Sequence, residues 1–439
     1  MRDIGLSLVV IVCLLWTIRY PFVGVLLWSW ITLMDPHKLA FGFSLNLRIN
    51  LLVAVVTLGS WFFNEKERKI PPIDANFVLT LLFFLWVTLN TSIGSFPWAS
   101  WHIWDRTWRI MLLGVMIAMT ATNRTRIHAL ILVDAMSLLW YGTKGGGFTL
   151  MTGGANHVMG PADTTIGDNN QLALAILIVI PLANYLRLHS ESRWLRLVFL
   201  AGMGLSVVSV LGSYSRGAFV ALGGLAVVAM FRAKRKWLYP LVAVALILPA
   251  LQFMPESFFN RMSTIQSADS DASFMGRLDA WGVAWKYAVE HFPFGAGFDG
   301  PQQPEVFGRY APGKDSHAAH SIYFQVLGDN GFIGLFLYLG ILITAFRNTM
   351  TVRKYTKGKP EFAWAFDLAG MIQLTLFAFC LGGAALSFAY YDNLFVCAGL
   401  LSVMREMVLR EAAATGWRKG PAEAGRAQGA LPAPTLVTE

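Results

Sequence analysis

Long apolar runs separated by short basic loops make up most of this chain of 439 residues. A run of about 20 mostly apolar residues is long enough to cross a bilayer as a helix. Only 14% of the residues are charged, whereas a soluble domain carries roughly 25%. In lipid, a helix satisfies its own backbone hydrogen bonds. The sequence therefore predicts an all-α polytopic membrane protein.

Five of the loops between apolar runs hold 17 of the 35 Lys and Arg residues. Cytoplasmic loops are enriched in Lys and Arg, so these loops are predicted to face the cytoplasm. They contain Lys66, Arg68 and Lys69; Arg124 and Arg126; Arg187, Arg193 and Arg196; Arg232, Lys234, Arg235 and Lys236; and the stretch from Arg347 to Lys359.

About twelve crossings are predicted, together with one sizeable extramembrane segment. Residues 4–34, interrupted at Arg19, cross once if the amino terminus is cytoplasmic and twice if it lies outside. The other spans are expected near 47–63, 75–94, 108–121, 127–142, 169–187, 195–213, 217–232, 237–253, 321–346, 361–385 and 387–404. The expected domains are N-terminal spans over 1–253, a loop domain over 254–320, C-terminal spans over 321–404 and a tail over 405–439.

Composition and motifs argue against several classes of function. The three cysteines, Cys13, Cys380 and Cys397, all lie in apolar runs, where packing is the expected role. The net charge of +9 resides mostly in the basic loops, so it does not indicate nucleic acid binding. The chain has neither a Walker loop nor a dinucleotide fingerprint, so soluble nucleotides are not indicated.

Arg216 stands in a tight turn, Ser213-Tyr214-Ser215-Arg216-Gly217, between two apolar runs on the side opposite the basic loops. A guanidinium group there either snorkels to the interface or binds an anion. Its planar fork matches phosphate oxygens, so a phosphate clamp is one interpretation and a snorkelling or helix-capping arginine is the other.

Arg277 belongs to Met275–His291, a predicted amphipathic helix within the long loop. Apolar residues recur there at helical spacing, at Phe274, Leu278, Trp281, Trp285 and Ala288. Such a helix lies on the membrane or on the helical bundle, and it places Arg277 at head-group height. The alternative is an ordinary solvated arginine or a local pair with Asp279.

His320 ends the long loop, three residues after His317. Histidine is the commonest general base near neutral pH, which makes His320 the first candidate and His317 the second. A zinc site with Asp315 as third ligand is the alternative. Asp269 and Asp271 have the spacing of a metal–nucleotide-sugar motif, although a solvated loop is favoured there.

Other polar residues in or beside the spans are further candidates. Asp329 lies between Gly328 and Gly331 in a span, which suggests local unwinding or close helix packing. Asn170 ends a polar loop that leads into another span. Arg106 and Arg109 also lie on the outer side, where interfacial snorkelling is one interpretation of both. Asp134 lies midway along a span, where a hydrogen-bonded core role is favoured.

Four motifs in this order form a pattern: Gly167-Asp168-Asn169-Asn170, Ser215-Arg216-Gly217, Gly276-Arg277 with Trp281, and His320-Ser321-x-x-Phe324 followed by Gly328-Asp329-Asn330-Gly331-Phe332-Ile333-Gly334. Together they resemble the bacterial O-antigen ligase/polymerase superfamily over about residues 160–345. The opening, from Met1 to His37, resembles a branch linked to exosortase-type exopolysaccharide systems. Ser321 departs from the pattern, because many members have Asn after the histidine.

The resemblance implies a GT-C-like glycosyltransferase of the bacterial inner membrane whose active site faces the periplasm. It implies a glycan on undecaprenyl diphosphate as donor and, for a ligase, a lipid A–core sugar hydroxyl as acceptor, with no metal or cofactor. Membrane lipids surround both substrates. His320 is then the expected base, and Arg216 and Arg277 the cations that neutralise the leaving diphosphate; His317, Asn170, Arg106, Arg109 and Asp329 are the expected substrate-binding residues. A polymerase or a protein glycan ligase using the same donor remains an alternative, and a polysaccharide transporter is the alternative from another class.

Overall fold

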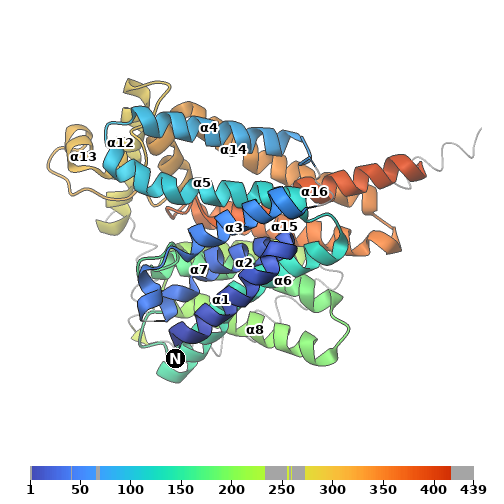
Figure 1. Ribbon diagram of the computed structural model, residues 1–439. Helices are drawn as coiled ribbons and strands as arrows, with labels where there is room; N and C mark the ends of the chain where they lie inside the picture. Colours follow the sequence, from blue (N-terminus) through green and yellow to red (C-terminus); the bar gives the residue numbers. More distant parts are fainter. Residues whose placement is uncertain are drawn as a thin grey trace, which may run out of the picture.

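The described part of the chain is helical, with no strand in it. The computed structural model describes residues 2–40, 42–65, 70–232, 255–256, 259 and 272–416. Its α-helices are α1 (Arg2–Arg19), α2 (Pro21–Met34), α3 (Ile49–Asn64), α4 (Ala75–Ile93), α5 (Pro97–Thr120), α6 (Arg124–Thr152), α7 (Asn169–His189), α8 (Arg193–Gly212), α9 (Arg216–Arg232), α12 (Ala272–Glu290), α13 (Pro304–Tyr310), α14 (Ile322–Thr356), α15 (Ala363–Gly383) and α16 (Asp392–Thr415) (Figure 1). Short 3-10 helices occur at Pro36–Leu39, Phe43–Asn46, Gly300–Gln302 and Pro360–Phe362.

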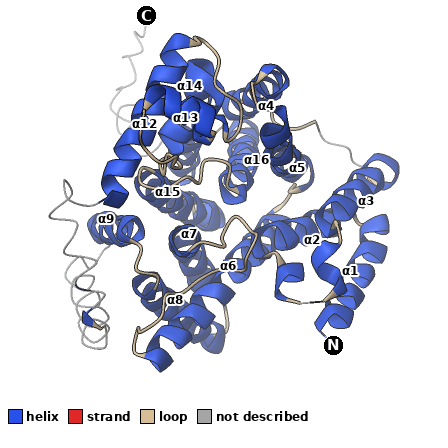
Figure 2. Ribbon diagram, turned by 90° about the vertical axis from the view of Figure 1, so that its left-hand side faces the viewer, coloured by secondary structure: helices blue, strands red, loops and turns tan. Residues whose placement is uncertain are grey.

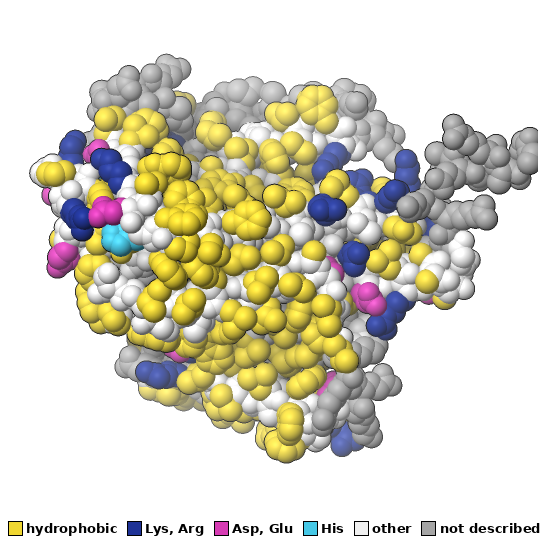
Figure 3. Space-filling view, turned by 90° about the horizontal axis from the view of Figure 1, so that it is seen from above, with side chains coloured by type: hydrophobic (Ala, Val, Ile, Leu, Met, Phe, Trp, Pro, Cys, Tyr) yellow, Lys and Arg dark blue, Asp and Glu magenta, His cyan; other side chains and the backbone are white. Residues whose placement is uncertain are grey.

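Five helical segments within the described ranges are long and apolar enough to cross a membrane by length and composition. They are Ala75–Ile93, Asn169–His189, Arg193–Gly212, Ile322–Thr356 and Pro360–Gly383. Figure 3 shows a broad hydrophobic band across one face of the molecule, with charged side chains at both ends of that face. The expected all-α membrane architecture is confirmed at this level, while the twelve crossings and the GT-C likeness stay predictions.

Some predicted features lie outside the described residues. These are the span near 237–253, the basic residues at 66–69 and 234–236, the acidic pair Asp269 and Asp271, and the tail from 417 onward.

The basic loops gather at one end of the bundle, which we call the basic end. It holds Arg124 at the start of α6, Arg193 at the start of α8 and Arg353 near the end of α14. The opposite end, which we call the site end, carries α12 and α13 together with the starts of α7, α9 and α14 (Figure 1).

Residues 4–34 form two antiparallel helices, α1 and α2. At the site end, the carboxylate of Asp3 accepts hydrogen bonds from the main-chain nitrogen and Oγ of Ser44, at 3.1 and 2.7 Å. At the other end of α1, Asn64 in the last turn of α3 donates to the main-chain oxygen of Ile18 at 2.8 Å. The segment therefore runs as two helices, with Asp3 at the site end, while the number of its membrane crossings stays a prediction.

Two segments that lie between the expected spans, 95–107 and 143–168, are partly helical rather than loops throughout. The segment 95–107 begins helix α5 at Pro97, a residue well suited to the first helical position. The segment 143–168 is helical as far as Thr152, through a glycine-rich stretch. A Cβ atom at Gly146 would stand 2.1 Å from the main-chain oxygen of Leu205, so the glycine allows α6 to pack closely on α8. Tertiary packing here outweighs the low helix propensity of glycine.

Helix α7 lies in the middle of the bundle, with α6, α8, α9 and α15 around it in the end-on view of Figure 2. Most of its side chains are buried, including Pro181 inside the helix. Thr375 of α15 donates its hydroxyl to the main-chain oxygen of Ile178 at 2.7 Å, beside this proline. Because α7 is packed on all sides, its first residues, Asn169 and Asn170, are held in place at the site end.

Helix α14 is interrupted at Gly331, which has φ 68° and ψ −169°. A Cβ atom there would lie 2.2 Å from the main-chain oxygen of Pro293. Gly328, one turn earlier, approaches Ala284 of α12 so closely that its Cβ would be 3.0 Å from that of Ala284. Both features suggested by the glycines around Asp329, local unwinding and close packing, are present.

The amphipathic helix α12 forms as expected, but a different face is buried. Its buried side consists of Ala280, Val283, Ala284, Tyr287 and Ala288, packed towards α14 and α13. Of the predicted stripe, Ala288 is buried and Trp281 is half-buried, whereas Leu278 and Trp285 are exposed. The aromatic positions predicted to form one apolar stripe therefore do not all point inward. Small residues such as Ala284 face α14 because they allow the two helices to approach closely, and Tyr287 fills the buried side further along α12.

Candidate active site

His320 lies at the site end, in the segment that connects α13 to α14. It adopts φ 44°, a left-handed conformation that residues other than glycine rarely take. Its main-chain nitrogen donates to Oγ of Ser387 at 2.8 Å, and the next residue, Ser321, is the N-cap of α14. The half-buried imidazole is thus held directly before the first residue of the long helix α14.

Helix α12 contacts the segment that bears His320 and the start of α14 through a hydrogen bond and a stacked ring pair. The indole N–H of Trp281 donates to the main-chain oxygen of Ala319 at 2.6 Å, and its ring stacks on Phe324 with centroids 4.8 Å apart and planes 7° apart. One turn earlier, Gly276 approaches the ring of His317, and a Cβ atom at this glycine would stand 2.9 Å from Cδ2 of His317. These contacts bring Arg277, the neighbour of Gly276, next to the histidine segment.

The charges around His320 favour its neutral form. Burial lowers the pKa of His320 most, and the positive charge of Arg277 lowers it further, with a smaller contribution from His317. The carboxylate of Asp168 acts in the opposite direction. A neutral imidazole at neutral pH is the state that accepts a proton, as a general base must.

The turn before Arg216 is tied to the start of α7. The side chain of Asn169 donates to the main-chain oxygen of Ser213 at 2.6 Å, and Oγ of Ser213 accepts from the main-chain nitrogen of Ser215 at 3.2 Å. Asp168 caps α7 and accepts from both nitrogens of Asn170, at 2.8 and 2.9 Å. The Gly-Asp-Asn-Asn loop and the Ser-Arg-Gly turn, far apart in the sequence, therefore form one unit.

Residues 384–391, between α15 and α16, join this unit to His320. The side chain of Gln171 donates to the main-chain oxygen of Ser387 at 3.4 Å, and the hydroxyl of the same serine receives the His320 bond. Beside Arg216, Gly217 lies against Ala385, with a Cβ position 3.4 Å from the Cβ of Ala385. The elements that bear Arg216, Asn170, Arg277 and His320 thus meet at the site end around this segment.

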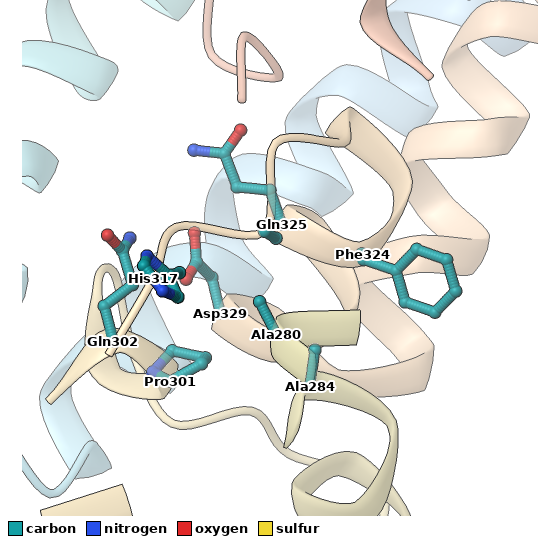
Figure 4. A pocket seen from close by; sticks show the side chains of 9 residues that line it. Ala280, Ala284, Pro301, Gln302, His317, Phe324, Gln325 and Asp329 are labelled. Carbon is teal, nitrogen blue, oxygen red and sulfur yellow. The ribbon is translucent and has the colours of Figure 1, made fainter. Parts of the chain in front are cut away.

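Asp329 lies below this assembly and is almost fully buried. Its carboxylate accepts the hydroxyl hydrogen of Tyr390 at 3.0 Å, and Asn330 donates to the same hydroxyl at 2.7 Å. Figure 4 shows Asp329 and His317 at a small cavity, about 10 Å³ in volume, which has room for about one water molecule. The carboxylate of Asp329 is thus held in a buried hydrogen-bonded network, and its expected role in substrate binding stays a prediction.

Arg106 and Arg109 belong to another polar cluster, on α5. Arg106 forms an ion pair at 3.0 Å with the fully buried Asp392, and Arg109 pairs at 2.9 Å with Asp105 one turn earlier. Asp35, after α2, faces the same cluster, and burial together with the charge of Asp392 raises its pKa to about 7, against the opposing effect of Arg106. Simple interfacial snorkelling does not describe Arg106, because its partner is inside the bundle.

Asp134 is a buried core residue, as expected. Both oxygens of its carboxylate accept hydrogen bonds from Asn393, at 2.9 and 2.8 Å.

Two residues that organise the site, Ser387 and Asp168, were not predicted from the sequence. Ser387 was expected to begin a span, but the structure ends α15 at Gly383 and begins α16 at Asp392. The polar pair Asp392-Asn393 was the available signal, since acidic and amide side chains are favoured at helix starts. The role of Asp168 beside His320 had no sequence signal beyond its place in the polar loop.

The metal alternatives find no support in the described residues. No group of three or more His, Cys, Asp or Glu side chains there is arranged to hold a metal ion. The pair Asp269 and Asp271 lies outside the described residues.

Two parts of the chain match known protein families. Residues 201–339 match the family model described as O-antigen ligase. The chain carries an O-antigen ligase family domain. This domain supplies Arg216, Arg277, His317, His320 and Asp329. Residues 1–191 match a family of unknown function, DUF5935, so Asn170, Arg106 and Arg109 come from that region. No curated protein matches the chain.

Proposed function

We propose that this protein is a membrane glycosyltransferase that moves a glycan from a lipid diphosphate to an acceptor hydroxyl. The donor is a polysaccharide on undecaprenyl diphosphate, and the acceptor is a sugar hydroxyl of the lipid A–core. In this proposal the basic end faces the cytoplasm and the site end faces the periplasm of the bacterial inner membrane. The O-antigen ligase family domain and the distribution of basic loops support this assignment.

The observation that carries the proposal is the proximity of Arg277 to His320 at the site end. The positive charge of Arg277 lowers the pKa of His320, so the two side chains repel each other whenever the imidazole is protonated. Such a pair does not stabilise the fold. It suits a reaction that needs a base for a hydroxyl group and a positive charge for a leaving anion. The turn bearing Arg216 meets the same segment through Gly217 and Ala385.

The chemistry proposed is a direct displacement at the anomeric carbon. The acceptor oxygen forms a bond to that carbon while its proton passes to the imidazole of His320. The bond between the anomeric carbon and the diphosphate oxygen breaks, and its electron pair leaves with the diphosphate. Arg216 and Arg277 stabilise the charge that develops on the leaving group. Attack from the opposite side inverts the anomeric configuration.

The outward face of α12 is suited to a lipid-linked substrate. Leu278, Trp285 and Val289 are exposed on it, and the ring of Trp285 contacts Phe332 of α14 edge-on with centroids 5.5 Å apart. Phe336, one turn further along α14, is also exposed. These side chains form an apolar surface beside the site, along which the polyprenyl chain of the donor would lie.

Asn170 and His317 are proposed to contact the substrates from the two sides of His320. The roles of Arg106 and Arg109 as acceptor-phosphate ligands stay predictions. Their guanidinium groups already contact Asp392 and Asp105, so a phosphate would add to these ion pairs.

The experiment is a transfer assay with the purified protein in proteoliposomes and a defined undecaprenyl-diphosphate-linked glycan. Lipid A–core, a second molecule of donor and a glycan-accepting protein are offered separately, with and without EDTA. We expect glycosylated lipid A–core at a rate that EDTA does not change. Chain growth on the donor would replace the ligase by a polymerase, modification of the protein would replace it by a protein ligase, and EDTA inhibition would restore a metal site. Donor that remains intact with every acceptor would contradict a glycosyltransferase.

A further inference from the structure

A second and larger cavity lies at the basic end, in the region that matches the family of unknown function. It has a volume of about 540 Å³ and is bordered by the last residues of α1, α3 and α5 and the first residues of α2 and α6. Its polar lining comes mainly from Arg19, Asn64, Glu65, Thr122, Asn123 and Arg126. None of these residues belongs to the candidate active site.

Two guanidinium groups supply positive charge to this cavity. Arg126 donates to the main-chain oxygen of Thr120 at 2.7 Å and stands over the ring of Phe22, 5.2 Å from its centroid. Arg19, the last residue of α1, stands 5.8 Å from the ring centroid of Tyr20. Within the described ranges, no carboxylate oxygen lies within 4 Å of either guanidinium group. Their charge is thus available to an anion.

Glu65 supplies a negative charge to the same cavity. Its Oε2 atom is buried and has no hydrogen-bond partner in the described structure. Leaving a charged acceptor without a partner is costly, so the site favours a ligand that brings a hydrogen-bond donor or a cation. A simple anion would meet the arginines but would be repelled by this carboxylate.

We propose that this cavity binds the head group of a zwitterionic aminophospholipid, of the phosphatidylethanolamine type. The phosphate meets Arg19 and Arg126, and the primary ammonium group donates to Glu65. A lipid is favoured over a soluble compound because the cavity lies at helix ends beside exposed apolar side chains. Trp16 on α1 and Phe62 and Phe63 on α3 are all more than half exposed. Basic pockets between membrane helices are known lipid head-group sites.

The test is native mass spectrometry of the delipidated full chain, titrated with three lipids of identical acyl chains. Phosphatidylethanolamine presents both charges and three ammonium donors, phosphatidylcholine has a cation without donors, and phosphatidylglycerol has the phosphate and neutral hydroxyl donors but no cation. We expect phosphatidylethanolamine to bind about tenfold more tightly than either of the others, the effect of one charge-assisted hydrogen bond. Equal affinities for the three lipids would overturn the proposal.

Two variants test separately the contact of Glu65 with the ammonium group and the contact of Arg19 with the phosphate. Glu65→Gln should bring the affinities for phosphatidylethanolamine and phosphatidylglycerol to within about twofold, because the amide cannot form the ion pair. Arg19→Gln, at an exposed position, should weaken binding of all three lipids. The matched controls are Glu361→Gln and Arg196→Gln, at the same end of the bundle, and both should bind lipid as the unchanged chain does. A Glu65→Gln variant that keeps the full preference would overturn the assignment of Glu65.

A competition experiment with a soluble head-group analogue distinguishes a lipid ligand from a small phosphate compound. Free phosphoethanolamine should fail to displace the bound lipid at a hundredfold molar excess. Displacement at equal concentrations would assign the cavity to a soluble ligand and overturn the lipid proposal. Because no residue here takes part in glycan transfer, the proposal stands or falls independently of the proposed function.

Discussion

Gly276 and His317 are in such close contact that a methyl group on the glycine would stand 2.9 Å from Cδ2 of the histidine. The contact sets how near α12, and with it Arg277, approaches the segment that carries His320. Because the imidazole of His317 is exposed, an added methyl group moves the ring without unfolding the helix.

We expect Gly276→Ala to lower the rate of glycan transfer by about tenfold or more, since small displacements of positioned groups are costly in catalysis. Thermal stability should change little, because alanine favours the helix. The control is Gly282→Ala in the same helix, where nothing lies within 4 Å of the added Cβ atom. Equal rates for the two variants would show that the spacing at Gly276 has no role in transfer.

The pH dependence of transfer tests the charges around His320. Protonated imidazole cannot act as a base, so the rate should fall as the pH drops through the pKa of His320, which lies below the ordinary value. Removing the positive charge in Arg277→Gln should raise this pKa and move the acid limb of the profile to higher pH. Removing the negative charge in Asp168→Asn should lower the pKa and move the limb to lower pH.

Both shifts are measured as the midpoint of the acid limb in initial-rate profiles, so they can be separated from changes in maximal rate. Asn at residue 168 can still cap α7, which keeps the local structure intact. Profiles with the same midpoint in both variants would contradict the assignment of the titrating group to His320.

Arg216→Lys tests the planar fork of the guanidinium group while conserving its charge. If Arg216 holds the diphosphate through two parallel hydrogen bonds, the rate should fall by about tenfold to a hundredfold, since lysine offers only a point charge. Arg193→Lys, at the basic end, is the matched control. Initial rates at saturating donor decide the matter, and a lysine variant within twofold of the parent would exclude a bidentate clamp.

The ion pair between Arg106 and Asp392 makes a prediction about stability. Arg106→Gln leaves the Asp392 carboxylate buried without its cation and should cost about 2–3 kcal/mol of the free energy of unfolding. This is at or below the lower end of the range of about 3–5 kcal/mol for fully buried pairs, because Arg106 is partly exposed. Asp392→Asn together with Arg106→Gln should recover most of this loss. Arg109→Gln, whose partner Asp105 is 54% exposed, should cost less than about 1 kcal/mol. Denaturation of the parent, Arg106→Gln, Asp392→Asn and the double variant in one detergent completes a double-mutant cycle that measures the pair, and Arg109→Gln is measured beside them.

The helices themselves were largely predictable from the sequence. The span expected at 169–187 corresponds to Asn169–His189, because a long apolar run begins directly after the helix-capping Asp168. Helix ends near proline and glycine were less accurate: α5 starts at Pro97 and α6 continues through Gly146, where contact with α8 decides the outcome. The buried face of α12 was also missed, because a pattern of apolar residues does not say which side has the space to pack.

The candidate site was predictable only in part, because its geometry depends on contacts between distant segments. Arg277 and His320 were identified from local motifs, but the bond from His320 to Ser387 spans 67 residues. The partner of Arg106 lies 286 residues away in the sequence, at the start of α16. No local periodicity indicates such pairs, which form when helix ends meet at one side of the bundle.

The initial rate of a His320→Gln variant in proteoliposomes, with saturating lipid-linked donor and lipid A–core, tests the proposed base most directly. Glutamine keeps hydrogen-bonding capacity but cannot accept a proton, so the rate should fall by about 10²–10⁴ while the protein remains folded and binds donor. Transfer within threefold of the unchanged protein would show that His320 is not the base and that the site proposed at this end of the bundle is wrong.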